Sequence, residues 1–124
     1  MIEAREGLMD EVIALASEVH RTLGPGLVAP VYAQALQQEL ALAGLRGERR
    51  SIAVSYKGST LASGLDADLV VEDSLVLEVK AIERFSTLHV AQLVSYLRLL
   101  GIRRGLLVNF NAIALKSGIR RISV

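Results

Sequence analysis

The chain has 124 residues, which fits one domain without a second core, and its 52% hydrophobic and 22% charged residues are typical of a folded chain. A net charge of +1 does not by itself indicate a nucleic-acid binder, and the absence of cysteine excludes disulfides, thiolate metal sites and cysteine nucleophiles. The sequence has no basic, apolar leader and no run of about 18 apolar residues, so we expect a single domain over residues 1–124 and a cytoplasmic location.

Two helices are predicted at the start of the chain. Apolar residues recur at helical spacing from Leu8 to Leu23, and Gly24-Pro25-Gly26 ends that pattern. A second helix is expected from Ala29 or Pro30 to Ala43, because proline suits the first turn of a helix and the glycine after Ala43 suits its end.

The hydrophobic pattern then changes to the two-residue period of β-strands. A first strand is expected over Ser51–Tyr56, followed by a turn at Lys57-Gly58. A second strand is predicted over Leu61–Val71, and a turn at Glu72–Ser74 leads into a third strand over Leu75–Ala81.

One more helix and two more strands complete the predicted elements. The helix covers Thr87–Leu100, the apolar segment Gly105–Asn109 indicates a buried strand, and Ile119–Val124 is a last strand. The order is therefore helix, helix, three strands, helix and two strands. Antiparallel hairpins followed by a helical crossover predict an α/β fold, or an α+β one, in which helices flank a mixed sheet.

Three charged residues in the strand region give the strongest chemical signal. A hairpin that turns near Asp73 places Asp68 beside Glu78, and Glu78 and Lys80 share a face because strand side chains alternate. Two adjacent carboxylates repel each other unless a cation lies between them, and Mg²⁺ prefers such oxygen ligands. Lys80 is then placed to hold an attacking water or to stabilise charge on a phosphate.

A solvated strand face would carry a similar Glu-x-Lys pattern. The residues around Glu78 and Lys80 are apolar, however, and charges in such β sequence are rarely tolerated without partners, which favours a functional site. On the third helix, Gln92 and Tyr96 are four residues apart and share a face. They are either a polar flank of that helix or groups that border the acids.

The motifs taken together resemble the GxxExxY family, a small-protein branch of the PD-(D/E)XK nuclease superfamily. The similarity runs from about Leu15 to Val124. Several ordered segments carry it: Glu18-Val19-His20, Leu23-Gly24-Pro25-Gly26-Leu27, Val31-Tyr32, Ala67-Asp68-Leu69, Leu77-Glu78-Val79-Lys80, Ala91-Gln92-Leu93, Tyr96-Leu97 and Leu106-Leu107-Val108-Asn109-Phe110-Asn111.

This resemblance implies a metal-dependent nuclease built on a central mixed sheet with flanking helices. By position, Asp68 and Glu78 would bind Mg²⁺ or Mn²⁺, and Lys80 would be the catalytic lysine. The implied reaction is hydrolysis of a nucleic-acid phosphodiester, with DNA expected ahead of RNA.

Three further residues take their expected roles from the same resemblance. Gln92 and Tyr96 match a Gln-x-x-x-Tyr helix motif of exonuclease-like branches, and His20 matches a position at which some branches supply a further metal ligand. His20 could equally be a core or helix-end residue. The glutamate of the Gly-x-x-Glu-x-x-Tyr motif is replaced by Ala29, which can neither bind metal nor move a proton.

Ala29 supports a second hypothesis, in which the chain is a catalytically impaired nucleic-acid-binding or assembly module that retains the nuclease fold. The basic clusters Arg46/Arg49/Arg50, Arg103/Arg104 and Arg120/Arg121 could follow a phosphate backbone, although solvated surface is the commoner explanation for such clusters. A homodimer is also expected, because so small a domain has little interior in which to bury its high hydrophobic fraction.

Overall fold

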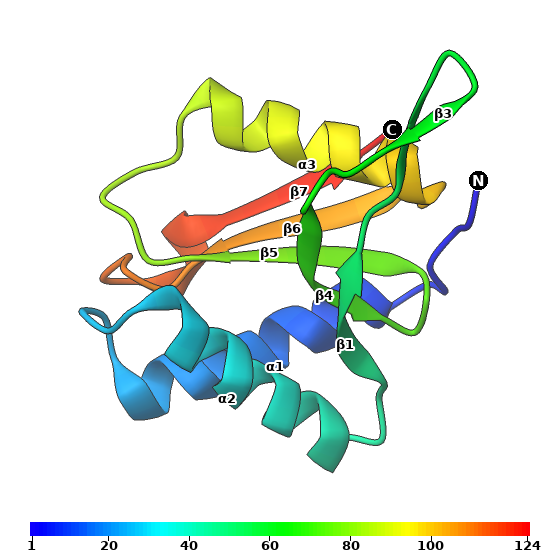
Figure 1. Cartoon of the computed structure of the whole chain (residues 1–124). Coiled ribbons are helices and arrows are strands. Elements are labelled where there is room, and N and C mark those ends of the chain that lie inside the picture. Colours follow the sequence, from blue (N-terminus) through cyan, green and yellow to red (C-terminus); the bar gives the residue numbers. More distant parts are fainter.

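A mixed five-stranded sheet separates two helical layers in the computed structural model, which describes residues 1–124 (Figure 1). Helices α1 (Leu8–Leu23) and α2 (Ala29–Leu42) cover one face, and α3 (Thr87–Leu100) covers the other. The strands, in spatial order, are β1 (Gly47–Ser51), β4 (Asp66–Val71), β5 (Leu75–Lys80), β6 (Arg104–Asn109) and β7 (Ile119–Ser123). Only β5 and β6 are parallel, and every other neighbouring pair is antiparallel. None of the three helices is long and apolar enough to cross a membrane.

The α/β class and the flanking helices are confirmed, but the number of strands differs from the prediction. The helices α1 and α3 have their predicted bounds, while α2 ends one residue early, at Leu42. A short 3-10 helix, η1 (Leu115–Gly118), precedes β7. The segment predicted as two strands holds four, because β2 (Val54–Tyr56) and β3 (Ser59–Leu61) form a separate hairpin that projects from the sheet (Figure 1).

The predicted strand Leu61–Val71 is interrupted by an irregular segment at residues 62–65. Gly64 has a φ of +61°, which favours glycine, and the Ser63 hydroxyl donates to the Ile52 carbonyl and accepts from the Leu65 N–H. The Ile52 N–H donates to the Leu65 carbonyl (2.9 Å) and closes the base of the hairpin. The chain therefore returns to the main sheet only at Asp66.

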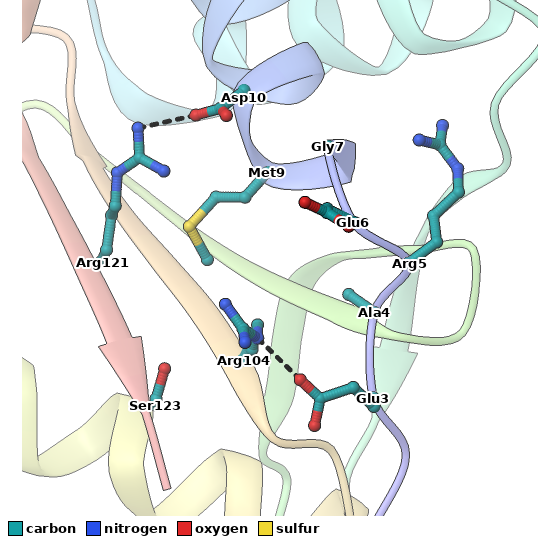
Figure 2. Close-up of a pocket in the computed structure, with 10 residues that line it drawn as sticks. All are labelled: Glu3, Ala4, Arg5, Glu6, Gly7, Met9, Asp10, Arg104, Arg121 and Ser123. Atoms are coloured by element: carbon teal, nitrogen blue, oxygen red, sulfur yellow. Dashed lines mark hydrogen bonds and ion pairs between the residues drawn. The ribbon is translucent and has the colours of Figure 1, made fainter.

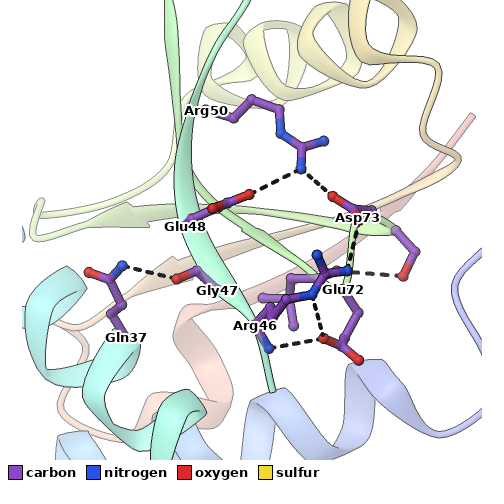
Figure 3. Close-up of polar contacts among 9 residues, drawn as sticks. Gln37, Arg46, Gly47, Glu48, Arg50, Glu72 and Asp73 are labelled. Carbon is purple, nitrogen blue, oxygen red and sulfur yellow. Dashed lines mark hydrogen bonds and ion pairs between the residues drawn. The ribbon is translucent and has the colours of Figure 1, made fainter. Parts of the chain in front are cut away.

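The turn between β4 and β5 fixes the register on which the charged residues depend. Glu72 and Asp73 both have positive φ, at 51° and 54°, and the Ser74 N–H donates to the Val71 carbonyl (3.0 Å) to close a tight turn over Glu72–Ser74. Arg50 and Arg46 bind the Asp73 carboxylate, the latter at 2.8 Å, and these bonds lower the pKa of Asp73 (Figure 3). Because these bonds hold the turn in place, Val71 pairs with Leu75, and this pair sets the register of the remaining pairs between β4 and β5.

Alternate residues of β5 enter two separate hydrophobic cores. Leu77 and Val79 belong to the core beneath α1 and α2, while Val76 belongs to the core beneath α3. Glu78 and Lys80 lie in step with Val76, so both face α3.

Helix α3 lies close to the sheet because β6 carries a glycine beneath it. A Cβ atom on Gly105 would lie 3.0 Å from the side-chain carbons of Leu93, closer than ordinary packing allows. The glycine therefore sets the height of α3 above the sheet, and with it the position of the polar side chains on the helix.

Replacing Gly105 with valine is expected to destabilise the protein by about 1–3 kcal/mol, because the added methyl groups have no space beneath α3. Urea unfolding measures the loss. Ser59→Val is the matched control, since Ser59 is an exposed strand position in β3. An unchanged unfolding midpoint for Gly105→Val would show that α3 is not held at this height.

Candidate functional site

Asp68 and Glu78 lie opposite each other, one residue pair beyond the last ladder pair of β4 and β5, Leu69 and Leu77. At this point side chains replace the backbone ladder. The Asp68 N–H donates to Glu78 Oε2, and the Val79 N–H donates to Asp68 Oδ2, both at 2.9 Å. Each carboxylate therefore bridges to the backbone of the other strand.

The second oxygen of each carboxylate has no partner among the side-chain hydrogen bonds of the structure. No fully buried side-chain nitrogen or oxygen of the chain lacks a partner, so these second oxygens are reached by solvent. Glu78 itself is only 3% exposed. Burial, and then the charge of Asp68, raises the pKa of Glu78 to about 7.

Lys80 continues the same face of β5 and forms no ion pair. Its charge lowers the pKa of Glu78, which opposes the effect of burial, so the ammonium lies within electrostatic reach of the acids. Lys80 is paired in register with Asn109 of β6, which is buried. The Asn109 amide donates to the Ile82 carbonyl (2.8 Å) and accepts from the Ile82 N–H (3.0 Å), so it fixes the chain just after Lys80.

Tyr96 of helix α3 lies near the same acid pair. Burial raises the pKa of the Tyr96 phenol, and the charges of Glu78 and Asp68 raise it further. The side chain of Gln92, one turn earlier on the helix, opposes this rise. The phenol therefore keeps its proton beside the carboxylates and can donate a hydrogen bond. Five predicted site residues, Asp68, Glu78, Lys80, Gln92 and Tyr96, are thus gathered on the α3 face of the sheet.

Comparison with known families decides the wider relationship. A profile of the PD-(D/E)XK nuclease superfamily matches residues 6–122, which is nearly the whole chain. The chain belongs to this superfamily. No curated protein and no solved structure matches it significantly.

Membership in the PD-(D/E)XK superfamily suggests a nuclease-like function, and its nucleases generally use divalent metal ions. The donors at the site fit such an ion. Asp68 and Glu78 each offer one unbonded oxygen, and Mg²⁺ is usually held by one or two carboxylates together with water and substrate phosphate. The chain has no cluster of three or more His, Cys, Asp or Glu side chains, so the remaining ligands would be water, phosphate or main-chain oxygen. When bound, a divalent ion supplies positive charge to the oxygens of a phosphodiester.

Two charged residues near the site were not among the predicted ones. Asp66, two residues before Asp68, adds to the rise in the pKa of Tyr96, and Arg49 on β1 lowers that of Glu78. Arg49 and Asp66 are ion-paired at 3.1 Å. The Asp-x-Asp spacing at the start of β4 was a visible signal for Asp66, whereas Arg49 approaches only through strand pairing.

His20 is not brought to the acid pair. It lies on α1, on the opposite side of the sheet, where its Nε2 atom is 2.7 Å from the Ala112 carbonyl oxygen. The ring also lies 6.5 Å from that of Phe110, between ring centres. No hydrogen bond or ion pair joins His20 to Asp68 or Glu78, and its contacts are those of a residue that holds the loop after β6. Ala29 begins α2 and leaves the first turn of that helix without an acid.

Most of the basic clusters are neutralised by acids in the folded chain. Arg46 and Arg50 bind acids around the β4–β5 turn (Figure 3). Figure 2 shows Arg104 bound to Glu3 and Arg121 bound to Asp10, across a cavity of about 740 Å³. None of the predicted site residues lines this cavity. These clusters therefore carry much less free positive charge than the sequence indicates.

The raised pKa of Glu78 predicts an unusual dependence of stability on pH. In the folded state the Glu78 carboxyl keeps its proton up to about pH 7, whereas the ordinary pKa of a glutamate is 4.5. The stability that the protonated carboxyl contributes is therefore fully present below pH 4.5 and is lost as the pH rises through 7. In metal-free protein, Glu78→Gln removes this loss and raises the free energy of unfolding at pH 8 by about 3 kcal/mol relative to wild type. Urea titrations between pH 5 and pH 8 measure the difference, with the exposed Glu6→Gln as control. Parallel pH profiles for wild type and Glu78→Gln would contradict it.

Proposed function

We propose that the chain is a divalent-metal-dependent nuclease that hydrolyses phosphodiester bonds of nucleic acid. The observation that carries the proposal is the reciprocal bridge between Asp68 and Glu78, which leaves one oxygen of each carboxylate unbonded. Mg²⁺ or Mn²⁺ suits these oxygens, because both are hard ions that prefer carboxylate and water.

The neighbouring side chains have distinct proposed roles. Lys80 orients the attacking water or offsets charge that develops on the phosphate, since its ammonium has no ion partner in the folded chain. Tyr96 keeps its proton and donates to a phosphate oxygen, and Gln92 holds the phenol in place. Asp68 and Glu78 remain ionised once a cation lies between them.

The finer assignment follows the sequence motifs. We place the chain in the GxxExxY branch of the superfamily, with DNA ahead of RNA as its substrate, a cytoplasmic location and a homodimeric state. Residues 1–124 act as one domain in this proposal, with β4 and β5 shared between its two hydrophobic cores.

The second candidate is a binding or assembly module that has lost cleavage. It is favoured by Ala29, which leaves the start of α2 without an acid, and by the lack of a third acid or histidine beside Asp68 and Glu78. The ion pairs of most arginines weigh against it, because a binding module that lacks metal chemistry depends on free positive charge.

Cleavage assays with single- and double-stranded DNA and RNA separate the two candidates. Wild type is expected to cut at least one of these substrates with Mg²⁺ or Mn²⁺, and Lys80→Ala is expected to lower kcat by about 10²–10³-fold. Lys116→Ala is the control, because Lys116 is an exposed lysine that also lacks an ion partner. Absence of cleavage on every substrate, or full activity in Lys80→Ala, would overturn the nuclease proposal.

Metal binding can be measured without cleavage. At about 100 times the dissociation constant, Mn²⁺ is expected to stabilise wild type by about 2.7 kcal/mol, and Asp68→Asn is expected to lose most of this gain. Thermal unfolding with and without metal measures the effect. Glu6→Gln is the control for loss of an exposed carboxylate and keeps the full gain. Equal gains in Asp68→Asn and wild type would place the ion elsewhere.

A further inference from the structure

Arg120 differs from most arginines of the chain because no acid binds it. Eight of the eleven arginines form ion pairs, and only Arg84, Arg98 and Arg120 do not. The only side-chain hydrogen bond of Arg120 goes to the carbonyl of the preceding residue, Ile119. Its guanidinium is exposed and retains donors for a ligand.

Arg120 lies in the same cross-strand row as the acid pair. Glu78 of β5 pairs with Leu107 of β6, and Leu107 pairs with Arg120 of β7. Paired residues in a sheet point to the same face, so Glu78 and Arg120 both lie on the α3 side. Two strand spacings separate their backbones by roughly 10 Å. This separation places Arg120 beside the acid pair, at the edge of the sheet, without contact between the two.

A fixed aromatic ring orients the guanidinium. The Arg120 guanidinium carbon lies 5.5 Å from the centre of the Phe85 ring, and the His89 ring meets Phe85 edge-on at 6.1 Å. His89 is held in turn, since its Nδ1 accepts the Ser86 N–H at 2.9 Å in the first turn of α3. Stacking over an aromatic ring leaves the edge of a guanidinium free to bind a phosphate.

The surroundings of Arg120 favour an anion. Arg84 directly precedes Phe85 and, like Arg120, forms no ion pair. Glu83 is the acid of the adjacent loop, and it is exposed. Positive charge is therefore in excess along the β7 edge, unlike at the other basic clusters.

We propose that Arg120, stacked on Phe85, binds a backbone phosphate of the nucleic-acid strand that flanks the one at the acid pair. This inference rests on the proposed nuclease function and specifies how the substrate is held. Leu107, between Glu78 and Arg120 in the row, is buried beneath α3, so the strand passes from the acid pair to Arg120 around the loop that carries Phe85 and not across the sheet surface. Arg120 is a binding and positioning residue, because it lies too far along the row to reach the reacting phosphate.

The test measures binding in a protein that cannot cleave. In a Glu78→Gln background without metal, Arg120→Ala is expected to weaken binding of a labelled single-stranded DNA of about 20 nucleotides by roughly tenfold. The slope of log affinity against log salt is expected to fall by about 0.7, the value for one lost phosphate contact on a single strand. Fluorescence anisotropy measures both quantities, and thermal unfolding confirms that each variant is folded.

Arg98→Ala is the matched control. Arg98 is an exposed arginine without an ion partner, on the last turn of α3, so its removal changes net charge equally. Its affinity is expected to stay within about twofold of the background. Phe85→Leu keeps an apolar residue but removes the stacking surface, so it is expected to weaken binding in the same direction as Arg120→Ala.

The outcomes separate this proposal from the nuclease proposal. An equal loss of affinity in Arg120→Ala and Arg98→Ala would show that only overall charge matters, and would overturn the specific site. An unchanged affinity in Arg120→Ala, or no DNA binding by the Glu78→Gln protein, would also overturn it. Selective loss in Arg120→Ala, together with absent cleavage by wild type, would support the phosphate site and overturn the nuclease proposal alone.

Discussion

The reciprocal bridge between Asp68 and Glu78 is the constraint on which the rest of the site depends. Where the backbone ladder of β4 and β5 ends, each carboxylate accepts an N–H from the other strand. The bridge supplies acceptors for two backbone N–H groups that the strand ladder no longer pairs, and it holds the two carboxylates next to each other. One interaction thus continues the sheet and assembles the acid pair, so neither residue can be replaced without affecting both.

The acid pair is held at an electrostatic cost that the surrounding fold offsets. Burial and the neighbouring carboxylate raise the pKa of Glu78 to about 7, so the fold opposes full ionisation of the pair in the absence of a cation. The strand register that places Asp68 beside Glu78 comes from the turn at Glu72 and Asp73. Arg46 and Arg50 hold this turn through the Asp73 carboxylate. Such stored repulsion is typical of sites that are completed by a ligand.

Much of the fold follows from local signals that the sequence displays. The bounds of α1 and α3 were predictable because glycine follows each apolar helical stripe. The approach of Asp68 to Glu78 was predictable because a short polar turn lies midway between them. The β2–β3 hairpin was not predicted, since its three-residue strands are too short to separate from their neighbours by alternation alone.

Features that depend on distant segments escaped sequence reasoning. The cluster at Arg46 and Arg50 is basic when read along the chain, but its acids come from the β4–β5 turn. His20 was grouped with the acids by resemblance, although helix packing places it across the sheet, against the Ala112 carbonyl. Arg49 reaches the site because β1 pairs with β4, and no local sequence pattern predicts that pairing. In each case the deciding contact spans a long stretch of sequence.

The position of β1 and β7 at the two borders of the sheet has a consequence for assembly. Border strands expose unpaired backbone groups that can recruit another copy of the chain, and charged side chains discourage such pairing. Here β1 carries Glu48, Arg49 and Arg50, and β7 carries Arg120 and Arg121, all of them at least partly accessible to solvent. Extension of the sheet between two copies is therefore disfavoured at both borders. A symmetric pair of subunits would therefore have to meet through helices or through the β2–β3 hairpin.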